Sequence, residues 1–283
     1  MDRSKPYPGF WHAVLLCVVF VGAQMAIGIV LAILDAILNL KLARHPGAVG
    51  LINLCAFAAV LSLVWLIDRP NPREVIALRR VSALAIMAVF VFTGGAIILL
   101  SEVDNLFRAV LPVPRFIQEL FLELGDASKH LWSSLFLLAM VAPVTEEIML
   151  RGVILRGFLK RFGFVRAMLL SSVLFGAMHL NPWQFISATL LGMLFAWWYA
   201  RTQSLVPCLI GHALANGTMV LHRSLPFEIR GFNAGDPFAS TAPQPLWFDA
   251  LGFVLLAAGL WMFQRATPPI PPPAESPPAP PII

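Results

Sequence analysis

The stretch Pro143-Val-Thr-Glu-Glu-Ile-Met-Leu-Arg151 places two adjacent carboxylates and an arginine at the end of an apolar run that begins near Leu131. An ionisable group inside or beside a membrane span is costly unless it is paired or hydrated, so it marks a candidate functional site. The sequence on either side decides whether this run is a membrane span.

The composition predicts an integral membrane protein. The chain has 283 residues, of which 59% are hydrophobic and 12% are charged, and its mean hydropathy is +0.80. Soluble proteins carry roughly a quarter charged residues. The net charge of +5 comes from basic residues at the ends of apolar runs, not from a basic stripe interleaved with aromatic residues. This pattern predicts a lipid bilayer as a partner and excludes nucleic acid.

Apolar stretches long enough to cross a bilayer predict an all-α, polytopic bundle of about eight transmembrane helices. They cover residues 10–38, 49–67, 81–100, 131–150, 165–179, 183–200, 205–221 and 246–263. With the N-terminus inside, the inner segments hold 13 of the 20 Lys and Arg residues. The positive-inside rule therefore predicts that both termini are cytoplasmic, and we expect a bacterial inner (plasma) membrane.

We expect one membrane-embedded domain over residues 1–266, with a motif core at 131–222, followed by a tail. The tail, 267–283, holds nine prolines and no basic residue, which predicts a disordered, extended segment. The third span is expected to end at Ser101-Glu-Val-Asp-Asn105, and residues 116–124 to form an interfacial helix. The three cysteines have no paired spacing and predict neither a disulfide nor a metal site.

Spacing separates the two acids of the opening stretch. Glu147 and Arg151 are i and i+4, the favourable orientation for an ion pair within a helix. Glu146 is five residues from Arg151, about 140° around the helix, so it is the freer carboxylate. Pro143 leaves the carbonyl of Ala139 without its helical donor, which predicts a kink that admits water beside the acids.

Two histidines are placed to meet these acids. If Gly163 is the centre of a helical hairpin, Glu146 lies 17 residues before it and His179 lies 16 after it, so the two reach a similar depth. His212 and Asn216 are i and i+4 and share a helix face. The remaining histidines fall at span ends or in loops: His12, His45, His130 and His222.

Each element alone is weak, because a lone histidine in a membrane helix often only bonds a neighbouring helix, and two glutamates also suit a transporter's ion site. Together, Glu-Glu-x-x-x-Arg, Phe-x-x-x-His and His-x-x-x-Asn resemble the CPBP family of CAAX proteases and bacteriocin-processing enzymes, which are intramembrane peptidases. Leu150 stands where many relatives carry an aromatic residue. The resemblance implies that Glu146 and His179 activate water, that His212 and Asn216 hold the oxyanion, and that Glu147, Arg151 and Phe175 support them.

Such a set matches the needs of peptide hydrolysis, which are a base for water, donors to the tetrahedral oxygen and a proton for the leaving amine. The resemblance implies a peptide or protein substrate in the membrane, and we expect a water-filled cavity among the fourth to seventh helices that opens near the cytoplasmic side. The eukaryotic branch of the family removes the last three residues of prenylated proteins, whereas bacterial relatives are linked to peptide maturation or bacteriocin immunity.

The cofactor and the function class each have an alternative. We favour a mechanism without a metal; the alternative is zinc held by Glu146, His179 and His212 with water as the fourth ligand, although His-Glu-x-x-His is absent. The same polar cluster would also suit a transporter or a non-catalytic immunity or scaffold protein. Paired interrupted repeats, typical of many transporters, are not evident, and the intact motifs argue against a scaffold.

Overall fold

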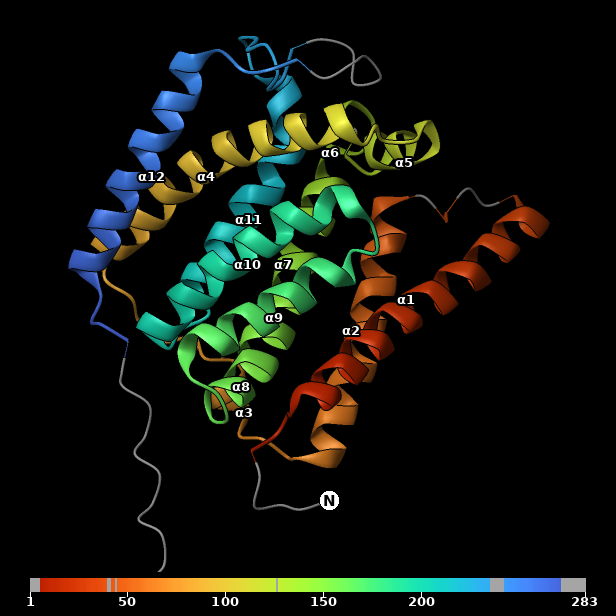
Figure 1. Cartoon of the computed structure of the whole chain (residues 1–283). Coiled ribbons are helices and arrows are strands. Elements are labelled where there is room, and N and C mark those ends of the chain that lie inside the picture. The colour runs from red at the N-terminus through yellow and green to blue at the C-terminus, as the bar shows by residue number, and fades with distance from the viewer. Residues whose placement is uncertain (1–5, 40–41, 44, 126, 235–241, 271–283) are drawn as a thin grey trace, which may run out of the picture.

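The computed structural model describes residues 6–39, 42–43, 45–125, 127–234 and 242–270, and the regular elements of this part are helical throughout. The predicted all-α bundle is confirmed (Figure 1). The elements are α1 Phe10–Leu38, α2 Pro46–Ile67, α3 Pro72–Val75, α4 Ala83–Val110, α5 Arg115–Gly125, α6 Ala127–Leu135, η1 Phe136–Val141, α7 Ala142–Glu147, η2 Ile148–Leu155, α8 Arg156–Leu159, α9 Phe164–Met178, α10 Pro182–Thr202, α11 Val206–Leu221, η3 His222–Ser224 and α12 Leu246–Ala266.

Five of the described helices are long and apolar enough to cross a membrane: α1, α2, α4, the continuous run Lys129–Leu159, and α12. The other three predicted spans form α9, α10 and α11, which do not meet that measure. α9 is apolar but has only 15 residues. It stops because Leu180 takes a positive φ of 53° and Asn181 then caps α10, its side chain accepting from the Gln184 N–H.

The helices pack in pairs around the run that carries the acids. α4 lies along α12, α1 along α2, and α9 along α10 (Figure 1). Glycine allows close approach at these contacts: a Cβ on Gly95 of α4 would lie 2.5 Å from the backbone nitrogen of Leu256 in α12. Small residues at such contacts are typical of membrane helices, because they let two backbones meet.

The first and last described residues lie on the same side of the bundle. We call this side the terminal end. It comprises residues 6–9, 68–82, 160–163, 203–205 and 267–270. Arg161 bonds the carbonyl of Pro6 there, and Ser204 Oγ donates to the Arg79 carbonyl at 2.9 Å. Figure 1 shows the N-terminal segment and the last turn of α12 on this side, away from α5 and α6.

The opposite end, the distal end, comprises residues 111–130, 179–183 and 222–245 where described. Trp183 Nε1 donates to the Leu111 carbonyl at 2.7 Å, and the rings of His45 and His130 meet at 4.8 Å. The helix expected at 116–124 is present as α5, and its interfacial position stays a prediction.

The predicted end of the third span at Ser101–Asn105 is wrong, because α4 continues to Val110. The polar side chains of this segment find partners in the loop before α12 instead of capping a helix end. Asn105 Nδ2 donates to the Gly231 carbonyl at 2.7 Å, and Glu102 Oε2 accepts from the Gln244 N–H at 2.9 Å. The helix stops just before Pro112, which disfavours helical backbone in the residue before it.

Thr267, the first residue of the predicted tail, packs against the bundle. Thr267 is buried, and it accepts from Arg201 through its hydroxyl at 2.8 Å and its carbonyl at 2.7 Å. Most of the predicted proline-rich tail, residues 271–283, lies outside the described residues.

Candidate active site

The helix that carries the acids contains two π-helical segments, η1 and η2, on either side of α7. In η1 the backbone N–H groups donate to the carbonyl five residues earlier, as the Ala142 N–H does to the Leu137 carbonyl. Pro143 has no N–H for the next carbonyl, that of Leu138, and the Asn216 side chain donates to it at 2.9 Å. The sequence predicted that the Ala139 carbonyl would lose its donor; π spacing shifts the loss by one residue, and a side chain from α11 fills it.

The predicted hairpin at Gly163 is present. α8 ends at Leu159, and α9 begins at Phe164 with Gly163 as its N-cap residue. The hairpin sets α9 against η2, so Phe175 reaches Arg151.

Glu147 and Arg151 form the ion pair that their spacing predicts. Arg151 Nη1 lies 2.9 Å from Glu147 Oε1, and the two side chains are 2% and 0% exposed. The guanidinium also donates to the Gly192 carbonyl at 3.0 Å and lies over the Phe175 ring, 4.9 Å from its centroid. A buried ion pair needs such additional partners, and removing one member typically costs about 3–5 kcal/mol.

His212 shares the same carboxylate. Its Nδ1 lies 2.8 Å from Glu147 Oε1, and its ring stacks on Phe195 and meets Phe175 edge-on. A carboxylate accepts, so Nδ1 donates and the lone pair of the neutral ring lies on Nε2. Glu147 thus fixes both the rotamer and the tautomer of His212, a link that spacing alone did not predict.

Glu146 is the less constrained carboxylate. Its side chain is 14% exposed, and its Oε2 lies 3.8 Å from His212 Nε2, too far for a hydrogen bond. This oxygen is buried and has no hydrogen-bond partner among the described residues. Because a buried acceptor without a donor is costly, the position favours a bound water or substrate that donates to it.

His179 ends α9 and is bound locally. Its Nδ1 lies 2.9 Å from the Phe175 carbonyl, which can only accept, so this ring also carries its lone pair on Nε2. Among the described residues it makes neither a hydrogen bond nor an ion pair with Glu146. Phe175 connects the two histidines, since its ring lies 5.2 Å from His179 and 5.6 Å from His212.

The structure therefore joins Glu147, Arg151 and His212 directly, sets Glu146 beside His212, and brings His179 to them through Phe175. Sequence reasoning missed Gly192 and Phe195, which hold Arg151 and His212 from α10. No signal in the sequence singles out either residue, because one acts through its carbonyl and the other is one apolar residue among many.

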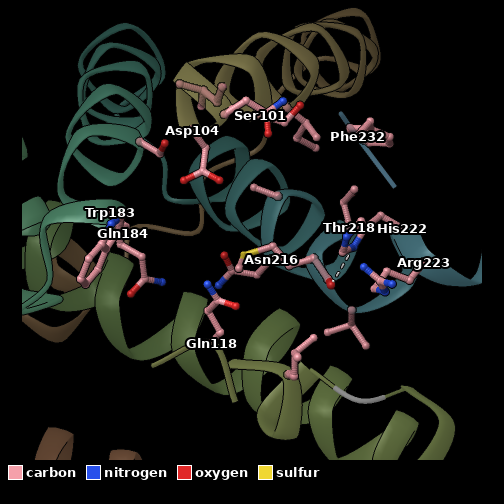
Figure 2. A pocket seen from close by; sticks show the side chains of 18 of the residues that line it. Ser101, Asp104, Gln118, Trp183, Gln184, Asn216, Thr218, His222, Arg223 and Phe232 are labelled. Atoms are coloured by element: carbon pink, nitrogen blue, oxygen red, sulfur yellow. Dashed lines mark hydrogen bonds between the residues drawn. The ribbon is translucent and has the colours of Figure 1, made fainter. Parts of the chain in front are cut away.

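A cavity of about 1070 Å³ lies at the distal end and extends inward as far as Asn216. Its walls come from α4, α5, α10 and α11, and Asn216, one turn beyond His212, lies on its wall. In Figure 2 the amides of Gln118, Gln184 and Asn216 extend into the same space. At its outer part, burial lowers the pKa of His222, although a hydrogen bond to the Met219 carbonyl opposes the shift.

A zinc site can be tested against the donor set. Glu146 and the two Nε2 atoms are suitable zinc ligands by type, and each Nδ1 is already bonded, as in many metal-bound histidines. However, no three His, Cys, Asp or Glu side chains of the described chain converge to hold a metal ion. The arrangement does not fit a three-ligand site, and we derive no step through a metal.

Comparison with known proteins finds two similarities. Residues 128–218 match the model of the Type II CAAX prenyl endopeptidase Rce1-like family. The chain is also 26% identical over 181 residues, 63% of its own length and 74% of the other, to "Putative membrane peptidase YdiL" of Bacillus subtilis (strain 168). No solved structure matches. The matched segment contains every motif residue from Glu146 to Asn216, so the resemblance to the CAAX protease family that the motifs indicate is confirmed.

Proposed function

We propose that this protein is an intramembrane endopeptidase that hydrolyses peptide bonds of membrane-associated proteins or peptides in a bacterial plasma membrane. The observation that carries the proposal is the buried, unpartnered oxygen of Glu146, 3.8 Å from the Nε2 atom of His212. A buried carboxylate oxygen that has no protein donor is suited to bind and deprotonate water.

In the proposed reaction, Glu146 takes a proton from a water that His179 helps to orient through its free Nε2. The water oxygen bonds to the carbonyl carbon of the substrate, and the carbonyl oxygen becomes an oxyanion. Glu146 then passes the proton to the amide nitrogen, the C–N bond breaks, and a carboxylic acid and an amine leave. Glu146 therefore acts first as the base that takes the proton from water and then as the acid that gives it to the leaving amine.

Asn216 and His212 are the proposed oxyanion donors. The Asn216 amide has two hydrogens, of which one is held by the Leu138 carbonyl and the other is free for the substrate. His212 donates from Nε2 when that atom also carries hydrogen, and Glu147 on Nδ1 balances the charge of the doubly protonated ring. We propose that Arg151 and Phe175 hold this pair in place and that no metal takes part.

The experiment compares membrane and secreted peptides from cells that express the native protein with those from cells that express Glu146→Gln. New peptide termini should appear only with the native protein. Glu228→Gln is the control, because Glu228 is an exposed carboxylate in the loop after α11. The same set of new termini in Glu146→Gln cells would sink the proposal. Their loss in Glu228→Gln cells would show that the loss of cleavage is not specific to Glu146.

A further inference from the structure

The cavity opens at the distal end of the bundle. Its outer residues include Glu119, Arg223 and Ser224, which are exposed in α5 and η3. Its inner wall carries Asn216, and Ser187 lines it from the first half of α10. The cavity therefore links Asn216, the one proposed site residue on its wall, with the side of the molecule where α5 lies.

The route from the terminal end is closed by packed side chains. Between Arg151 and that end lie Leu155 and Phe158 on the same helix run, and Trp198 and Cys208 on α10 and α11, each with an exposed fraction of 0%. Close-packed interiors of this kind leave no voids much larger than a water molecule. A peptide segment cannot reach Glu146 from the terminal end without unpacking this layer.

The charges of the described residues place the terminal end in the cytoplasm. Ten Arg and Lys side chains lie at or near that end: Arg69, Arg73, Arg79, Arg80, Arg156, Lys160, Arg161, Arg166, Arg201 and Arg265. Five lie at or near the distal end: Arg108, Arg115, Lys129, Arg223 and Arg230. The side with the excess is the cytoplasmic side by the positive-inside rule, which counts Lys and Arg near the ends of spans.

These observations are incompatible with a cytoplasmic opening if the termini are cytoplasmic. We propose that the cavity opens to the extracytoplasmic side, and that the substrates are peptide segments exposed there or held in the outer leaflet. The substrate part of this statement rests on the proposed peptidase function, whereas the direction of access is a property of the fold alone.

The cavity wall suits a peptide segment. The amides of Gln118, Gln184 and Asn216 can bond backbone N–H and C=O groups, and Leu100 and Leu191 supply apolar contacts. The side-chain carbonyl oxygen of Gln118 is buried and without a hydrogen-bond partner in the described structure, so it is available to a backbone N–H.

The test measures access without requiring activity. The three native cysteines are replaced (Cys17→Ala, Cys55→Ala and Cys208→Ser), and single cysteines are then introduced as Ser187→Cys on the cavity wall, Ser224→Cys at the rim, and Arg73→Cys at the terminal end as a matched control. Right-side-out and inside-out membrane vesicles are treated with a charged, membrane-impermeant maleimide. Gel filtration in detergent and thermal unfolding establish that each variant is folded.

The expected result is labelling of Ser187→Cys and Ser224→Cys in right-side-out vesicles, and of Arg73→Cys only in inside-out or permeabilised vesicles. The reverse pattern would overturn the proposed direction and leave the peptidase function untouched. Labelling of Ser224→Cys but not Ser187→Cys from outside would also overturn it, because the cavity would then be closed at this end. Adding Glu146→Gln should leave all labelling unchanged, which separates this test from that of the reaction.

Discussion

Glu146 and Glu147 are neighbours in the chain with opposite environments. Glu147 is fully buried and accepts from Arg151 and His212 through one oxygen, Oε1. The Oε2 atoms of both acids are buried without a hydrogen-bond partner in the described structure, so the two acids differ in the two partners of Glu147 Oε1. A carboxylate bonded to two cationic or donor groups is an orienting residue, and one without donors is free to exchange a proton with water, so the two acids should differ in what their loss does.

Replacing each acid by glutamine should separate stability from activity. Glu147→Gln leaves the Arg151 guanidinium buried without a countercharge, and we expect it to lower the free energy of unfolding by about 3–5 kcal/mol. Glu146→Gln removes no protein hydrogen bond, so its unfolding free energy should stay within about 1 kcal/mol of the native value. Its cleavage rate should fall about 10²–10⁴-fold, as for loss of a general base.

Denaturant unfolding in detergent and a cleavage assay on a substrate found through its new termini supply the two measurements. Glu147→Asp serves as a control, because it keeps the negative charge and should retain part of the stability. A Glu147→Gln protein as stable as the native one would contradict the buried ion pair.

The arrangement of the site also predicts the response to metal removal. Because the three zinc-ligand candidates do not converge, dialysis against a strong chelator should leave the cleavage rate of the purified protein unchanged. Metal content and activity are measured on the same sample before and after dialysis. Stoichiometric zinc that is lost together with activity, and restored with it, would overturn the metal-free proposal.

Among the elements, the π-helical segments beside the acids have a local cause. Pro143 removes the donor to the Leu138 carbonyl, and Asn216 supplies the replacement from α11. Wide turns of this kind are frequent at functional sites. Because Pro143 lacks an N–H, the Leu138 carbonyl bonds Asn216, and this bond links a proposed oxyanion residue to the helix that carries Glu146.

This link predicts a specific coupling between Pro143 and Asn216. In the native background, Asn216→Ala leaves the Leu138 carbonyl without its donor and should cost about 1–3 kcal/mol of stability. In a Pro143→Ala background a backbone N–H is available, so the same substitution should cost less, with a coupling energy of about 0.5–3 kcal/mol.

The four unfolding free energies of this double-mutant cycle are measured in one detergent. Thr218→Val is the control on the same helix, because its hydroxyl bonds the Leu214 carbonyl of its own helix, and its cost should not depend on Pro143. Equal costs of Asn216→Ala in both backgrounds would show that the two residues do not interact.

The contact between α9 and α10 positions His179 and Phe175. A Cβ on Gly176 would lie 2.7 Å from the Phe185 carbonyl oxygen, a backbone atom that cannot rotate away. Gly176→Ala should therefore cost about 1–3 kcal/mol by overpacking and also lower the cleavage rate per folded molecule, because it displaces the neighbours of Gly176.

Gly95→Ala is the matched substitution, since its Cβ would meet the α12 backbone equally closely but away from the histidines. We expect a similar loss of thermal stability and an unchanged cleavage rate per folded molecule. Full activity in Gly176→Ala, or an equal loss in both variants, would contradict a positioning role for the α9–α10 contact.

At the scale of the whole molecule, the sequence predicted what depends on local spacing. The helices, the hairpin at Gly163 and the Glu147–Arg151 pair follow from apolar length, turn residues and i,i+4 geometry. The extension of α4 to Val110 did not, because it depends on bonds from Glu102 and Asn105 to segments more than 120 residues away.

In the site, too, local spacing predicted some features, and others depend on how the helices pack. The two histidines and Asn216 were named as a set from their motifs, but the bond from His212 to Glu147 depends on how α11 packs against η1 and α7. The side on which the cavity opens likewise depends on which end of the bundle is filled by Leu155, Phe158 and Trp198. Neither packing is encoded in the spacing of one helix.

The domain boundary gives a last prediction, which concerns the folded molecule as a whole. Thr267 accepts twice from Arg201, and the chain beyond Ile270 is rich in proline and has no apolar periodicity. A protein that ends at Ile270 should unfold at the same temperature as the full chain, since no predicted core is removed. One that ends at Ala266 loses the two Thr267 acceptors of the partly exposed Arg201, which keeps the Gln264 carbonyl, and should be less stable by about 1 kcal/mol. Thermal unfolding of the two truncated proteins, with Arg201→Gln in each, checks the cause: the substitution should destabilise the longer protein more, because only there does Arg201 bond Thr267. If the protein ending at Ile270 were the less stable one, the residues after it would belong to the packed domain.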